Sequence, residues 1–130
     1  MRLKGAPMDD RGFLVLGGAG LVGIQVAHRI AAELQPERLV IVSRRERTVA
    51  GAVEELQTRW PHVDVVGEGG VGFRRDDDRR RSRADLLADP ACREGVFEDL
   101  LGPFAAAYGR SRLAGLLERY RPDVVVDAVN

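Results

Sequence analysis

Residues 12–23 are the most informative part of the sequence and read GFLVLGGAGLVG. The stretch begins with a short apolar run that ends at glycine, which is typical of a β-strand buried on both faces. A helical repeat of apolar residues follows from Gly20 to Leu34 and is closed by Pro36. A second buried strand is predicted at residues 38–43. Together these segments predict a β-α-β unit with parallel strands.

The turn between the first strand and the helix has the context in which glycines bind a dinucleotide. Because glycine lacks a side chain, the backbone can turn tightly, approach a pyrophosphate and bring the helix close to the strand. Free N–H groups and the helix dipole then face the phosphates. The alternative is a glycine turn that serves packing alone. The predicted cofactor-binding residues of the turn are Gly17, Gly18, Ala19, Gly20, Leu21, Val22 and Gly23.

The remaining chain continues the alternation of strands and helices. We expect an exposed loop at residues 67–83, where four glycines are followed by six arginines and three aspartates. The other predicted elements are a helix at 48–60 with Thr48 as N-cap, a strand at 62–66, helices at 96–101 and 104–120, and a strand at 123–129. This pattern predicts an α/β fold, a Rossmann-like doubly wound parallel sheet with strand order 3-2-1-4.

The length of 130 residues is enough for one domain and excludes a two-domain enzyme within this chain. The predicted organisation is a polar leader at 1–11 and a Rossmann domain at 12–130, which contains the loop 67–83. An unpaired edge beyond the last strand would favour a homo-oligomer.

Two motifs resemble the short-chain dehydrogenase/reductase superfamily, in particular its extended, epimerase/dehydratase-like branch. Members of that branch open with a strand followed by Thr-Gly-Gly-x-Gly-Phe-Ile-Gly, and residues 17–23 follow this pattern, with Leu16 in place of the threonine. Residues 121–126, which read RPDVVV, are similar to the start of the fourth strand in the family. The resemblance implies the NAD(P)-binding domain of an oxidoreductase. We expect Ala128 and Val129, after that strand, to join the cofactor site, since dinucleotides bind at this edge.

The end of the second strand indicates which cofactor the domain prefers. An acidic residue there favours NAD, whereas arginine neutralises the additional 2′-phosphate of NADP. The sequence has Ser43, Arg44 and Arg45, with Glu46 following. We therefore expect NADP rather than NAD, with Ser43 and the arginines at the phosphate. The alternative is that the arginines are only a solvated surface.

The catalytic pair of the family is missing. Family members use a tyrosine with a lysine four residues later, but Tyr108 is followed at that spacing by Arg112 and Tyr120 by Val124. The one lysine of the chain, Lys4, precedes the first strand. The chain therefore resembles only the N-terminal, cofactor-binding half of the family, and no catalytic residue is predicted.

Other reactive side chains lack the partners that chemistry needs. His28 and His62 have no acidic or histidine residues at metal-ligand spacing, so no metal site is predicted. Cys92 stands alone and is interpreted as a small apolar residue rather than a nucleophile. Asp127 lies at the end of the last strand, the edge where ligands bind, but a structural role is an interpretation of at least equal weight.

Composition limits the remaining functions. Twenty basic and twenty acidic residues cancel, so no overall field draws the chain toward nucleic acid or a membrane. No apolar run is long enough for a membrane helix, and a cytoplasmic location is expected. We predict the NADP-binding domain of an oxidoreductase or epimerase, catalytically incomplete. A non-catalytic, dinucleotide-binding regulatory module is the alternative. Binding of RNA or an acidic partner by residues 74–83 is disfavoured, because three aspartates neutralise that run.

Overall fold

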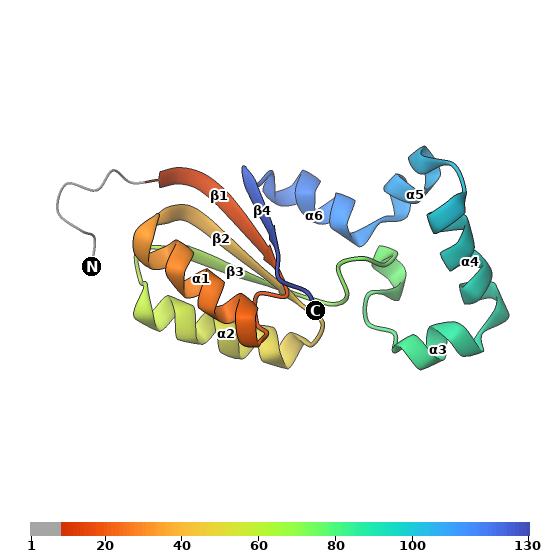
Figure 1. The fold of residues 1–130 in the computed structure, drawn as a ribbon, viewed down its shortest axis with the longest axis horizontal. Coiled ribbons are helices and arrows are strands. Elements are labelled where there is room, and N and C mark those ends of the chain that lie inside the picture. Colours follow the sequence, from red (N-terminus) through yellow and green to blue (C-terminus); the bar gives the residue numbers. More distant parts are fainter. Residues whose placement is uncertain (1–8) are drawn as a thin grey trace.

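The structure is a computed structural model and describes residues 9–130. Four strands alternate with helices, and most of the helices lie between the third and fourth strands (Figure 1). The elements are β1 (Asp9–Leu16), α1 (Leu21–Glu33), β2 (Pro36–Ser43), α2 (Glu46–Arg59), β3 (Asp64–Gly69), the 3-10 turn η1 (Asp76–Asp78), α3 (Arg83–Ala88), α4 (Pro90–Leu101), α5 (Phe104–Arg110), α6 (Arg112–Tyr120) and β4 (Val124–Asp127).

The strands form one parallel sheet in the order β3-β2-β1-β4, which confirms the predicted doubly wound α/β fold. Successive side chains of β1 and β2 point to opposite faces, so each strand contributes to two cores. On one face Val15 and Ile41 pack in a core with Ala27 of α1 and Leu56 of α2. On the other face the core includes Leu116 of α6. Both strands are buried on both sides, as their continuous apolar sequences predict.

The predicted leader is too long at its C-terminal end. β1 already begins at Asp9, because β2 begins at Pro36 and Asp9 pairs with that residue in the parallel ladder. Residues 9–11 therefore belong to the sheet. Residues 1–8, which include Lys4, lie outside the described part of the chain.

The third strand is displaced from its predicted position at 62–66. His62 lies in a turn, and β3 runs on to Gly69 in register with β2. Its glycines are required by packing against α2. A Cβ atom at Gly67 would come within 2.5 Å of the Val49 side chain, and one at Gly69 within 2.2 Å of Glu46. The sequence predicts a loop at these glycines because glycine is rare inside strands, except where another element approaches closely.

The prediction of an exposed loop at 67–83 is wrong for much of its length. Beyond β3, Arg75 is only 26% exposed and its guanidinium bonds to both carboxylate oxygens of Asp99 on α4. Arg110 of α5 donates to the same carboxylate at 2.6 Å. Charge pairing with distant acids orders this segment, whereas its local sequence only shows a charged run.

Helix boundaries in the second half depend on polar caps that apolar periodicity does not show. The helix predicted at 104–120 is divided at Ser111, whose hydroxyl accepts from the Ala114 N–H at 3.2 Å and caps α6. The helix predicted at 96–101 begins earlier, at Pro90, with Asp89 as its cap. Thr48 is not an N-cap, since α2 begins at Glu46.

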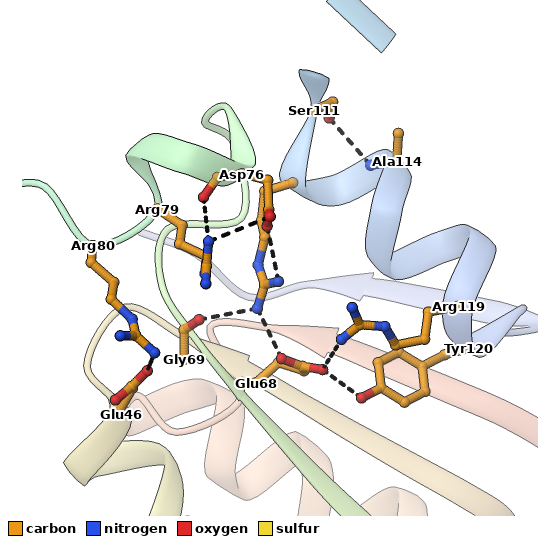
Figure 2. A network of polar contacts seen from close by, with 11 residues as sticks. Glu46, Glu68, Gly69, Asp76, Arg79, Arg80, Ser111, Ala114, Arg119 and Tyr120 are labelled. Carbon is orange, nitrogen blue, oxygen red and sulfur yellow. Dashed lines mark hydrogen bonds and ion pairs between the residues drawn. The ribbon is translucent and has the colours of Figure 1, made fainter. Parts of the chain in front are cut away.

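An ion-pair network joins this helical segment to the sheet (Figure 2). Arg112, 7% exposed, donates to Glu68 of β3 at 2.9 Å and to Asp76 of η1 at 3.1 Å. The Glu68 carboxylate also accepts from Tyr120 and Arg119 of α6. Burial opposes ionisation of Glu68, but the hydrogen bonds from Tyr120 and Arg112 outweigh it and lower the pKa of the carboxyl.

We predict that the Glu68→Gln substitution lowers the free energy of unfolding in a pH-dependent manner. Because the pKa of Glu68 is lower in the folded than in the unfolded chain, its ionised form stabilises the fold above the unfolded pKa. This contribution is lost as the pH falls through the folded pKa. The expected loss at pH 7 is about 1–3 kcal/mol. Urea denaturation followed by circular dichroism should show the gap between wild type and variant closing as the pH falls from 7 to 3. Glu54→Gln, at an exposed position of α2, is the control, and a gap independent of pH would contradict the prediction.

Candidate functional site

A cavity of about 500 Å³ lies at the carboxyl edge of the parallel sheet. This edge is where doubly wound folds bind ligands, because strand-to-helix turns diverge there. The volume is in the range of small-molecule and cofactor sites. Its walls come from the glycine turn, the ends of β2 and β4 and the segment after β3. Of the predicted residues, Gly17, Ala19, Gly20, Leu21, Val22, Ser43, Arg44, Arg45, Ala128 and Val129 line it.

The glycines of the turn have different structural roles. Gly17 has φ of 72°, and a Cβ there would lie 2.8 Å from the carbonyl oxygen of Ala128. A Cβ at Gly23 would lie 1.9 Å from the carbonyl oxygen of Gly17. These two positions allow α1 and the end of β4 to meet at the turn.

Gly18 and Gly23 lie beneath the cavity rather than in its wall. A Cβ at Gly18 would meet the Ile41 side chain at 2.9 Å, on the interior side of the turn. A larger residue at Gly18 would therefore disturb the core before it reached a ligand in the cavity. Gly20 does line the cavity, and a Cβ added there would meet only the Gly17 carbonyl oxygen within 4 Å, at 3.2 Å.

The N-terminus of α1 is open toward the cavity. Gly20 is the N-cap and no side chain caps the helix, while the first turn contains no acidic residue. Backbone N–H groups in the first turn of a helix have no acceptor within the helix, so they remain available to an anion. Leu21 is 88% exposed and Val22 59% exposed. An occupant of the cavity would therefore cover apolar side chains and meet free N–H groups together.

Ser43 fixes the shape of the turn. Its hydroxyl oxygen accepts from the Ala19 N–H at 3.0 Å, so the end of β2 holds the glycine turn in place. The sequence predicts a phosphate contact for Ser43 but not this hydrogen bond to the glycine turn. The hydroxyl hydrogen is still available to donate to a ligand.

Arg44 and Arg45 are exposed at the cavity wall, directly after β2. Glu46 follows them, and an acidic residue here would repel a phosphate. Its carboxylate, however, forms an ion pair with Arg80 of the segment after β3 (Figure 2). Glu46 therefore does not neutralise Arg44 and Arg45, and the cavity wall keeps their positive charge.

Sequence reasoning missed one wall of the cavity. Residues 70–73 line it together with Thr48 and Asn130. Gly70 donates its N–H to the carbonyl oxygen of Ser43 at 2.9 Å, which holds this segment against the end of β2. The predicted strand order already indicates this wall, because the carboxyl ends of parallel strands share one edge and β3 ends beside β2.

Neither tyrosine is placed or activated for proton transfer at this cavity. The phenol of Tyr108 donates to Glu118 at 3.1 Å, and this hydrogen bond raises the pKa of Tyr108. Burial, with a hydrogen bond to Glu68, raises the pKa of Tyr120. Neither side chain lines the cavity. Arg112, four residues after Tyr108, is occupied in the ion-pair network.

Other polar side chains have structural partners. Both ring nitrogens of His28 are engaged, Nδ1 by the indole N–H of Trp60 at 2.9 Å and Nε2 by Glu55 at 2.7 Å. Asp127 accepts from the Val129 N–H at 3.0 Å, which turns the chain after β4. Partial burial and a hydrogen bond to Asp89 raise the pKa of the Cys92 thiol. Among the side chains of residues 11–130, no group of three or more His, Cys, Asp or Glu residues is arranged to hold a metal ion.

None of the helices in residues 9–130 combines the length and apolar character that crossing a bilayer requires. Comparisons of the chain with protein-family models, with curated proteins and with solved structures found no match. The fold and the geometry of the cavity are therefore the basis on which a function is proposed.

Proposed function

We propose that the chain binds a dinucleotide of the NADP type in the cavity at the carboxyl edge of the sheet. It would act as the cofactor-binding domain of an oxidoreductase or epimerase of the short-chain dehydrogenase/reductase kind. The pyrophosphate would lie at the N-terminus of α1, where N–H groups and the helix dipole favour negative charge. The adenosine 2′-phosphate would lie at Arg44 and Arg45.

One observation supports this proposal most strongly. The uncapped N-terminus of α1 and an arginine pair without a competing acid line the same cavity. A dinucleotide phosphate at the 2′ position needs a separate anion site from the pyrophosphate. The ends of β1 and β2 lie side by side in the sheet and would offer these two places.

A non-catalytic, dinucleotide-binding module is the second candidate function. The phenols of Tyr108 and Tyr120 favour it, because their raised pKa values make each a weaker acid than an unperturbed tyrosine. The two candidates share the binding step and differ in turnover.

We predict that Gly20→Val abolishes NADPH binding, because a branched side chain would stand where the pyrophosphate approaches the helix. NADPH fluorescence is the suitable readout. Tryptophan fluorescence is less suitable, because Trp60 lies at the far end of α2, about 20 Å along the helix from its N-terminus. Gly51→Val is the matched control, since a Cβ at Gly51 meets no atom within 4 Å. Equal affinities of wild type and Gly20→Val would contradict the proposed site.

We predict that the double substitution Arg44→Ala and Arg45→Ala removes the preference for NADPH over NADH. Each charge-assisted hydrogen bond to the 2′-phosphate is expected to stabilise the complex by about 1.5–3 kcal/mol at low salt. NADPH affinity should therefore fall at least about tenfold for each arginine, while NADH affinity changes little. Titrations at two salt concentrations measure this, and the preference should shrink as salt rises. A wild type that binds both cofactors equally would show that these arginines are only surface charge.

We predict that the 130-residue chain binds NADPH without sustained turnover. Hydride transfer to a carbonyl needs a proton donor beside the nicotinamide, and neither tyrosine lines the cavity. NADPH oxidation should stay at background across a panel of aldehydes, ketones and nucleotide sugars. Turnover that follows the pure protein and is lost in Tyr108→Phe or Tyr120→Phe would exclude the non-catalytic candidate.

A further inference from the structure

A second, larger cleft of about 650 Å³ lies among the helices between β3 and β4. Helices α3, α4 and α5 form an arc that stands away from the sheet, and α6 leads back to it (Figure 1). Residues from all four helices line the cleft, and so does Phe73 of the segment after β3. Phe73 also lines the proposed dinucleotide cavity. The two cavities are therefore neighbours with one shared side chain.

The cleft has a buried floor and exposed apolar walls. Leu86 and Ala114 in its lining are 6% and 5% exposed, whereas Leu100 and Phe104 are 74% and 79% exposed. Soluble proteins tolerate single exposed apolar residues, but several around one hollow indicate a ligand site. The shape and lining suit an apolar chain or ring of small-molecule size.

Charge at the cleft favours an anion. Arg75 is neutralised by Asp99, and the other lining acid, Asp78, lies 3.8 Å from Arg81. Arg74 donates to the main-chain carbonyl of Arg81, an uncharged acceptor. No carboxylate among the described side chains, those of residues 11–130, lies within ion-pair distance of Arg74 or Arg83, and both arginines line the cleft. Two cationic groups thus remain uncompensated beside an apolar surface.

We propose that this cleft binds an amphipathic carboxylate, such as a medium-chain acyl acid. Its apolar part would pack against Leu86, Leu100 and Phe104, and its carboxylate would bind Arg74 and Arg83. That this ligand is the substrate of the neighbouring dinucleotide site rests on the proposed function; the binding itself does not. The shared Phe73 places the ligand next to the cofactor cavity.

Isothermal calorimetry of the full chain with octanoate tests the proposal. Octanoate should bind at least tenfold more tightly than octylammonium, because the cleft holds positive charge. Ala107→Phe should weaken octanoate binding at least tenfold, since Ala107 lines the cleft and the ring would occupy it. Ala105→Phe, on the same helix but outside the lining, is the matched control and should bind as wild type. Thermal melts of both variants confirm that each remains folded.

The charge contacts are tested by Arg74→Gln with Arg83→Gln, which should reduce the affinity for octanoate and leave that for octanol unchanged. Arg29→Gln on α1, where the guanidinium pairs with Glu33 of the same helix, is the control. Equal binding of octanoate and octylammonium, or an unchanged affinity in Ala107→Phe, would overturn the proposal.

NADPH titration of the same proteins separates the two proposals. Octanoate binding without NADPH binding would support the cleft and contradict the proposed function. NADPH binding without octanoate binding would support the proposed function and contradict the proposed ligand of the cleft. Displacement of NADPH by octanoate would place octanoate in the dinucleotide cavity and overturn the proposal. Analytical ultracentrifugation measures the oligomeric state. A dimer that Ala107→Phe dissociates, together with no octanoate binding, would overturn the proposal and identify a second copy of the chain as the occupant of the cleft.

Discussion

The contact between Gly23 and the carbonyl oxygen of Gly17 is the constraint on which the rest of the site depends. No side chain fits there, since a Cβ at Gly23 would lie 1.9 Å from that oxygen. The close approach seats α1 on the end of β1 and directs the helix N-terminus at the cavity. Gly17 in turn has a positive φ and contacts the chain at Ala128, which brings the end of β4 to the same place. Backbone contacts at these glycines thus join two walls of the cavity, the glycine turn and the end of β4.

The second half of the molecule depends on charge rather than on apolar burial. Of its helices, α6 belongs to a buried core through Leu116, and β4 packs against the other core through Val124 and Val126. The segment before it is ordered by arginines that reach acids far away in sequence, such as Arg112 to Glu68 and Arg75 to Asp99. Loss of one partner would leave the other charge partly buried and uncompensated, so these contacts favour one arrangement of the segment. The same segment supplies Phe73, which lines both cavities, and this links the arrangement of the helices to the proposed ligand sites.

The two cavities differ in how they are built. The cavity at the sheet edge follows from parallel strands, whose carboxyl ends and turns converge in every doubly wound fold. The cleft among α3 to α6 follows from the division of a predicted helix at Ser111, because an unbroken helix from residue 104 to 120 would not turn back toward η1. An antiparallel bridge between Ser111 and Arg75 marks this turning point. One serine cap therefore shapes the surface that the amphipathic carboxylate is proposed to occupy.

The sequence alone predicted both buried central strands and the glycine turn from local apolar runs and glycine spacing, and the strand order from the alternation of strands and helices that is typical of a doubly wound sheet. Ten of the twelve site residues predicted from the sequence line one cavity of the structure, while Gly18 and Gly23 lie beneath it. Only the tertiary structure decided that β3 extends to Gly69 and that the charged run after it is ordered. Those outcomes depend on contacts between residues far apart in the chain, such as Arg112 with Glu68 across 44 positions, and no local pattern encodes which distant acid an arginine will meet.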